Sequence, residues 1–148
     1  MNRAEKRRNK KLADKAAKVS KSEQAASPVS TEQQQTLTIQ QAIDLGLQHH
    51  NAGDLPKAES VYKQVLQSEP NQPVALHFLG VIAHQMGKND IAEDLIKKAI
   101  SIKPGYAEAH SNLGNALKEL GKLVDAVVSY NNALVIKPDY ADAHNNLG

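Results

Sequence analysis

Six histidines are the side chains of this sequence best suited to hold a metal ion or to carry a proton. His49 and His50 are adjacent, and His77 and His84 are seven residues apart, which is about two turns of a helix. Zinc takes three or four converging protein ligands, and neither a cysteine nor a suitably spaced carboxylate completes a set here. We therefore expect no metal and no cofactor.

Motifs for catalysis are also missing from the sequence. It contains no glycine-rich phosphate loop, no nucleophile elbow and no paired-carboxylate motif, and the absence of cysteine excludes a thiol nucleophile. Serine, histidine and aspartate residues are scattered along the chain. We expect no catalytic residue and no enzyme activity in this segment.

A repeat of 34 residues explains why similar side chains recur along the chain. Residues 102–114 (IKPGYAEAHSNLG) and 136–148 (IKPDYADAHNNLG) are identical at ten of thirteen positions. The same offset relates three further sets: Gly46, Gly80, Gly114 and Gly148; Gly53, Gly87 and Gly121; and Pro70, Pro104 and Pro138. The repeats are therefore 39–72, 73–106 and 107–140, followed by a truncated fourth repeat at 141–148.

Each repeat has the pattern of a helical hairpin. Apolar residues recur every three or four positions, which indicates two amphipathic helices per repeat. Gly121 lies between the two helices of the third repeat, where a positive φ would end the first helix. Pro138 ends the second helix because it lacks a backbone N–H. We expect the small residues Gly114 and Ala126 to lie where the helices of a hairpin approach each other.

The first 38 residues differ from the repeats in composition. Residues 1–21 hold nine Lys or Arg and two acidic residues, a net charge of +7, whereas the rest holds nine basic and fourteen acidic residues, a net charge of −5. We predict a basic disordered tail at 1–21 and a polar linker at 22–38, which is rich in Ser, Thr and Gln. The tail could contact nucleic acid or an anionic membrane, but it lacks interleaved aromatic residues, so we favour a solvated tail.

Nothing in the sequence directs the chain to a membrane or for export. The basic start is not followed by the apolar run of a secretory signal, and 18 consecutive apolar residues occur nowhere. We expect a cytoplasmic protein.

The positions of small and apolar residues over 39–148 resemble the tetratricopeptide repeat (TPR) family. The third repeat matches the family signature at Leu113, Gly114, Ala126, Tyr130, Ala133 and Pro138. This resemblance implies an all-α fold, a right-handed superhelical array of antiparallel helical hairpins, or α-solenoid. The amino-acid sequence of the repeats is similar to that of the repeat region in bacterial O-linked N-acetylglucosamine transferase-like proteins. In those proteins the repeats present substrate proteins to a glycosyltransferase domain. His110 and His144 occupy the family's tryptophan place, which marks them as structural.

In this family the first helices of the hairpins line a concave groove, and we expect partner contacts there. The outward positions that we single out are Phe78, Val81, His77, His84, Asn112, Asn115, Asn145 and Asn146. Asn112 and Asn146 have the same place in successive repeats, and the transferase family holds peptide backbone with asparagines at this place. The alternatives are that the asparagines lie on a solvated helix face and that Phe78 packs against a neighbouring helix.

The family's other well-known site, a carboxylate clamp for chaperone tails, does not fit this sequence. Its lysine, arginine and asparagine places hold Ile43, Leu47, Phe78, Glu108 and Asn112. Two functions remain. One is a scaffold that binds a partner peptide or protein in the groove, and the other is the N-terminal substrate-recognition arm of a larger transferase whose catalytic domain lies outside this fragment. The sequence leaves the oligomeric state open.

Overall fold

The computed structural model describes residues 31–147, and their side chains from Ile39 onward. All of the regular structure in this part of the chain is helical. The helices are α2 (Thr31–Asn51), α3 (Leu55–Ser68), α4 (Pro73–Gln85), α5 (Asn89–Ile102), α6 (Ala107–Glu119), α7 (Leu123–Ile136) and α8 (Ala141–Leu147). The all-α prediction is confirmed. The tail at 1–21 lies outside the described residues.

The start of α2 differs from the prediction. Within the described residues the helix spans Thr31–Asn51, so residues 31–38 are helical where the sequence analysis placed part of a linker. Glutamine, glutamate and leucine, which occur in this segment, are good helix formers. The chain divides into two units after Thr38, and the second unit, Ile39–Gly148, holds the hairpins described below.

The turns between paired helices are made by glycine, as predicted. Gly53, Gly87 and Gly121 have φ values of 80°, 78° and 77°, in the region that other residues rarely adopt. The backbone N–H of Gly121 donates to the carbonyl of Lys118, and that of Lys122 to the carbonyl of Leu117, which closes the end of α6. Each first helix therefore ends at this glycine turn, and the second helix folds back along it.

Within each hairpin a glycine of the first helix faces a large side chain of the second. A Cβ atom added to Gly46 would lie 2.7 Å from the ring of Tyr62, and one added to Gly114 would lie 2.5 Å from the ring of Tyr130. At the equivalent place in the second repeat, Gly80 faces Ile96. The close approach predicted at Gly114 is thus made with an aromatic ring, and Ala126 is buried in the same cluster.

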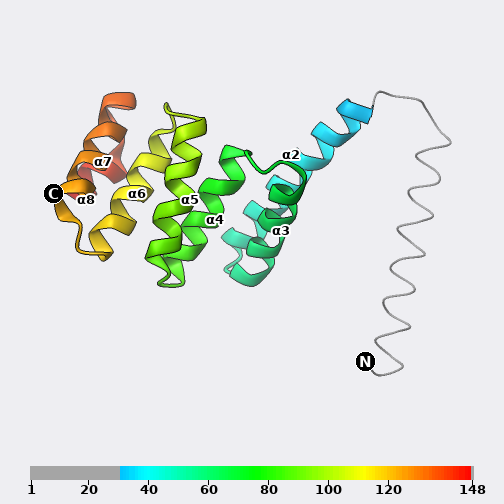
Figure 1. Ribbon diagram of the computed structural model, residues 1–148, viewed down its shortest axis with the longest axis horizontal. Coiled ribbons are helices and arrows are strands. Elements are labelled where there is room, and N and C mark those ends of the chain that lie inside the picture. The colour runs from blue at the N-terminus through cyan, green and yellow to red at the C-terminus, as the bar shows by residue number, and fades with distance from the viewer. Residues whose placement is uncertain (1–30, 148) are drawn as a thin grey trace, which may run out of the picture. The chain divides into compact units, whose positions relative to one another are not determined.

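Successive hairpins stack so that their first helices are neighbours. Helix α4 contacts α6, and α6 contacts α8, while each second helix also contacts the first helix of the next hairpin. Figure 1 shows α4, α6 and α8 in this succession, with α5 and α7 between them. None of the described helices combines the length and apolar character that a membrane span requires.

Candidate functional site

The residues predicted for the groove lie on the first helices α4, α6 and α8, and seven of the eight reach the surface. Asn145 is exposed and His77 is buried. The remaining six are half-buried: Phe78, Val81, His84, Asn112, Asn115 and Asn146. None of the eight carries a formal charge when its histidines are neutral, so this face offers amide, aromatic and aliphatic groups.

His77 was predicted as a surface contact, and this was wrong. Only 2% of the residue is exposed, because Phe78 and the ring of Tyr106 pack against it, with ring centroids 4.8 and 4.6 Å away. Burial lowers the pKa of His77 to about 4, and the nearby charges of His50 and Lys103 act in the same direction. His77 is therefore a neutral core residue that cannot touch a partner.

Hydrogen bonds link this buried histidine to the two asparagines of α6. His77 Nδ1 lies 2.8 Å from the Tyr106 hydroxyl, and His77 Nε2 lies 2.8 Å from Asn112 Nδ2. Asn112 Nδ2 is a donor, so Nε2 accepts and the proton of the neutral ring is on Nδ1. The assigned tautomer thus donates to Tyr106 and orients the Asn112 amide.

The same network continues along α6 to the second helix of the hairpin. Asn115 Nδ2 donates to Asn112 Oδ1 at 3.5 Å, and the Tyr130 hydroxyl donates to Asn115 Oδ1 at 2.6 Å. Each asparagine amide has two donor hydrogens and two acceptor lone pairs. One donor and one acceptor position of each amide are used inside the protein, and the other positions remain for a ligand.

Phe78 has both a packed side and an open side. Its ring stacks on Tyr62 at a centroid distance of 5.8 Å and an interplanar angle of 14°. The ring of His50 approaches it edge-on at 6.2 Å. The packing alternative is therefore correct for one face of the ring, while Phe78 remains half-buried and still contributes apolar surface beside Val81.

The remaining polar residues of this face are tied to neighbouring helices. His50 Nε2 lies 2.8 Å from Gln85 Oε1, and His84 Nδ1 lies 2.6 Å from Asn89 Oδ1. Asn146 lines a hollow of about 310 Å³ together with Tyr130 and other residues of α6 and α7. Asn112 and Asn146 thus share a repeat position but have different surroundings.

His110 and His144 are structural, as the resemblance implied. His110 Nε2 donates to the carbonyl oxygen of Pro104 at 2.9 Å, and His144 Nε2 donates to that of Pro138 at 2.8 Å. Each histidine therefore fastens the turn before its helix to the helix itself. Among the described residues, no group of three His, Asp or Glu side chains converges to hold a metal ion.

Two tyrosines of the network were missed by the sequence reasoning. Tyr106 had no assigned role, and Tyr130 was noted only as a signature residue. For Tyr106 the sequence did contain an indication, because a tyrosine recurs one repeat later at Tyr140. The residue 29 positions before each tyrosine is polar, His77 in one repeat and Ser111 in the next. A tyrosine just before a first helix could have been expected to contact the preceding repeat.

Comparisons with protein families identify the repeats of this chain. A TPR repeat model matches residues 114–148, and tetratricopeptide repeat models match residues 95–128 and 74–106. Together the matches span 74–148, which is 75 of the 148 residues. No curated protein sequence matches the chain significantly.

Several solved structures have the same fold. A mutant O-GlcNAc transferase from Thermobaculum terrenum is 33% identical with a TM-score of 0.75, over 76% of this chain. This chain spans 22% of the length of that protein. The second TPR domain of human RPAP3, in complex with an HSP70 peptide, is 22% identical with a TM-score of 0.67, over 72% of this chain and 88% of that one. The Sgt2 TPR domain from Aspergillus fumigatus is 20% identical with a TM-score of 0.70, and 74% of each chain is covered.

Proposed function

Because the chain belongs to the tetratricopeptide repeat family, we propose that this protein-interaction scaffold holds an extended segment of a partner protein against α4, α6 and α8. The described residues consist of repeats, and no catalytic domain is found among them. We name the surface formed by Phe78, Val81, Asn112, Asn115 and Asn146 the amide-aromatic face. The proposed site is this face.

The observation that carries the proposal is the fixed orientation of two neighbouring amides. Asn112 is held by His77, and Asn115 by Tyr130, so neither amide must be ordered when a ligand arrives. An amide donates and accepts, which matches the alternating groups of a peptide backbone. Each such hydrogen bond contributes about 0.5–1.5 kcal/mol, so two amides supply part of the affinity and direct the chain's path.

Phe78 and Val81 supply the apolar part of the site. Both are half-buried on α4, next to the amides of α6, with which α4 is in contact. Aromatic residues that keep one open side are common anchors in interfaces. A ligand that combines an apolar side chain near Phe78 with free backbone groups near Asn112 and Asn115 fits this arrangement.

A second candidate function is the substrate-recognition arm of a larger transferase. The 33% identity to the Thermobaculum terrenum O-GlcNAc transferase, over 76% of this chain, favours it. The gene sequence beyond the codon for Gly148 tests this candidate. A nucleotide-sugar-binding fold there would support it, whereas further repeats followed by a stop codon would support the free-standing scaffold.

The chaperone peptide of the human neighbour is a less suitable model for the ligand. At 22% identity that likeness reports the fold, and the places of a carboxylate clamp hold Leu47 and the 5% exposed Ile43 here. We therefore favour a partner recognised by its backbone and an apolar side chain. The cytoplasmic location, and any contact of residues 1–21 with nucleic acid or an anionic membrane, also remain proposals.

Selection from a phage-displayed peptide library, followed by calorimetry on the selected peptide, tests the proposal. We expect Phe78→Ala, and Asn112→Ala combined with Asn115→Ala, each to weaken binding about tenfold or more. The control Ser60→Ala changes an exposed residue of α3 and should leave the affinity unchanged. Equal affinity in all four proteins would refute the proposed site.

A further inference from the structure

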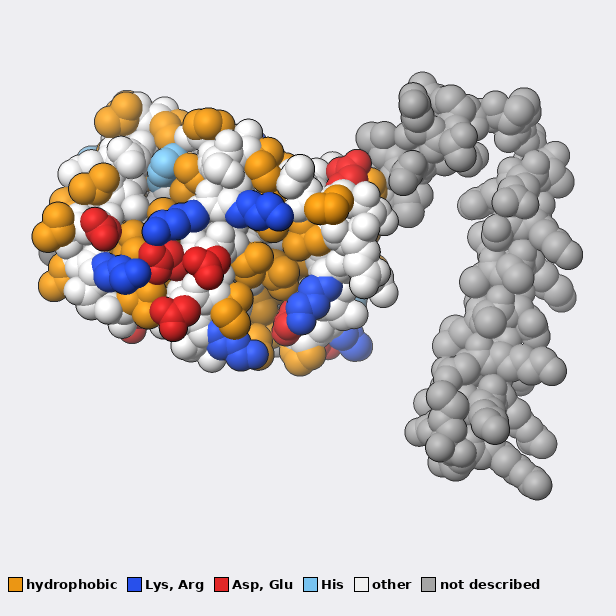
Figure 2. Space-filling model, in the orientation of Figure 1, with side chains coloured by type: hydrophobic (Ala, Val, Ile, Leu, Met, Phe, Trp, Pro, Cys, Tyr) orange, Lys and Arg blue, Asp and Glu red, His pale blue; other side chains and the backbone are white. Residues whose placement is uncertain are grey.

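A cleft between α3, α4 and α5 lies on a different face of α4 from Phe78 and Val81. It has a volume of about 150 Å³, and its apolar lining comes from α4, α5 and Met86 in the turn between them. Two of these side chains are unusually open, since Met86 is 45% and Ile91 51% exposed. Figure 2 shows hydrophobic side chains at the bottom of a hollow between charged ones on this side of the molecule. The residues that line the cleft are Glu59, Lys63, Leu79, Ile82, Ala83, Met86, Lys88, Ile91 and Leu95.

The next repeat provides an internal comparison, because the same positions recur 34 residues later. There Lys122 Nζ lies 3.0 Å from Glu93 Oε2, and Lys97 Nζ lies 2.8 Å from Glu93 Oε1. Both lysines lower the pKa of Glu93 through hydrogen bonds. The glutamate is 7% exposed. Two lysines therefore share one carboxylate at this place.

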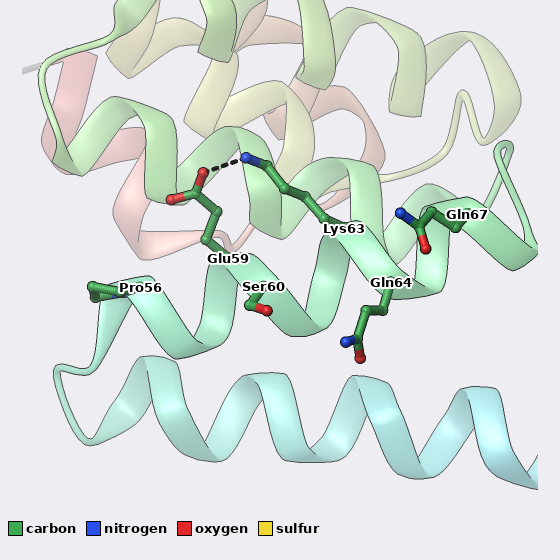
Figure 3. A pocket seen from close by; sticks show the side chains of 6 residues that line it. All are labelled: Pro56, Glu59, Ser60, Lys63, Gln64 and Gln67. Atoms are coloured by element: carbon green, nitrogen blue, oxygen red, sulfur yellow. Dashed lines mark ion pairs between the residues drawn. The ribbon is translucent and has the colours of Figure 1, made fainter. Parts of the chain in front are cut away.

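At the first cleft the second lysine lacks this partner. Glu59 accepts from Lys63 at 2.7 Å, and Figure 3 shows this ion pair on α3, on the side facing the neighbouring helices. Within the described residues, Lys88, the equivalent of Lys122, makes no ion pair. Its charge acts on Glu59 without a direct contact. Two lysines and one glutamate give the rim a net charge of +1.

The lining of the first cleft is more apolar than the equivalent residues of the next repeat. Ile91 and Leu95 stand where the next repeat has Asp125 and Ser129. The carboxylate of Asp125 is near Lys122 and adds to its favourable surroundings. Ala83 stands where the next repeat has the larger, buried Leu117. Next to it, Ile82 stands where the next repeat has Ala116, so the larger side chain is on the neighbouring position of α4. The first cleft thus lacks the carboxylate of its counterpart and has a small side chain at Ala83.

We propose that this cleft is a second docking site, which takes an apolar side chain of a partner protein next to a carboxylate that pairs with Lys88. The apolar side chain would occupy the volume above Ala83, between Met86 and Ile91. The carboxylate would supply the group that Asp125 provides one repeat later. The site lies apart from the amide-aromatic face and does not depend on it.

Three blocked eight-residue peptides test the proposal by titration against the full chain. One has leucines flanked by glutamates, one has the same leucines flanked by lysines, and one has alanines flanked by glutamates. Methyl NMR signals of Met86 and Ile91 report occupancy of the cleft. We expect saturable shifts with the first peptide, and affinities at least about fivefold lower for the other two, the size expected for one exposed ion pair or a few lost methyl contacts.

Four variants make the test specific. Lys88→Glu and Ile91→Asp should each weaken the first peptide by about fivefold or more; Ile91→Asp gives Lys88 the internal carboxylate found in the next repeat. Lys98→Glu makes the same charge change on an exposed part of α5 and should have no effect. Phe78→Ala should also have no effect, which separates this site from the proposed groove. Equal binding of the lysine-flanked peptide, or unchanged binding by Lys88→Glu and Ile91→Asp, would overturn the proposal.

Discussion

Tyr62 and Tyr130 occupy the same place in the first and third repeats, yet their hydroxyl groups have opposite surroundings. The Tyr130 hydroxyl donates to Asn115 Oδ1 at 2.6 Å. The Tyr62 hydroxyl is fully buried and has no hydrogen-bonding partner among the described residues, because the position equivalent to Asn115 is Leu47. Burial raises the pKa of Tyr62 to about 12. Replacing each tyrosine by phenylalanine should therefore change stability in opposite directions.

The expected sizes follow from the cost of an unpaired polar group. Tyr130→Phe loses a hydrogen bond and frees the Asn115 amide, so we expect a loss of about 0.5–1.5 kcal/mol. Tyr62→Phe removes a hydroxyl whose burial costs about 1–3 kcal/mol when it is unpaired, and the ring keeps its place against Gly46. We expect this variant to be more stable than the parent by about 1 kcal/mol.

Urea unfolding of both variants gives the answer, provided that the slope of the free energy against urea is unchanged. A double-mutant cycle adds a control. Leu47→Asn offers an acceptor to Tyr62, so it should cost about 1 kcal/mol less in the parent than in Tyr62→Phe. Equal destabilisation by Tyr62→Phe and Tyr130→Phe, or a cycle without coupling, would refute this interpretation of the two hydroxyl groups.

Three further predictions concern packing and protonation. Gly114→Ala places a Cβ atom 2.5 Å from the Tyr130 ring, so it should lower the free energy of unfolding by about 1–3 kcal/mol. The control Gly105→Ala meets nothing within 4 Å and should not change the melting temperature. Equal melting temperatures for the two variants would contradict this prediction. Ala126→Leu adds volume at a residue that is 2% exposed, so its melting temperature should fall, and an unchanged melt would show that the site has room. Burial lowers the pKa of His77 from 6.5 to about 4, so the unfolded chain binds the proton more readily. The free energy of unfolding should therefore be highest with respect to this group above pH 6.5. It should fall by about 3 kcal/mol as the pH decreases toward 4. When the free energy of unfolding is measured with urea at several pH values, His77→Gln should depend less on pH between 6.5 and 4 than the parent. The same pH dependence in both proteins would contradict this prediction.

Sequence periodicity predicted the fold well because each repeat carries its own signals for helix and turn. The positive φ of Gly53, Gly87 and Gly121 follows from a glycine at the end of each first helix. His110 and His144 each follow a recurring proline by six residues, and each donates a hydrogen bond to the carbonyl oxygen of that proline. Their structural role was therefore predictable from the repeat. These features depend on residues close in the chain, so one sequence suffices to find them.

Features that depend on contacts between repeats were harder to predict. His77 has the spacing of a surface residue on α4, but the chain before α6 places Tyr106 over it. The spacing of apolar residues within one helix does not predict which of its sides the neighbouring hairpin buries. The start of α2 was missed for another reason, since residues 31–38 form helix without the apolar stripe that the pattern search requires.

The most direct test of the central claim is a map of a selected peptide on the isotope-labelled chain. We predict that the side-chain amide signals of Asn112 and Asn115 and the ring signals of Phe78 shift on binding. The effect should disappear in Phe78→Ala combined with Asn115→Ala. Shifts confined to the outer sides of α3, α5 and α7, with affinity unchanged in that double variant, would contradict the assignment of partner binding to the amide-aromatic face.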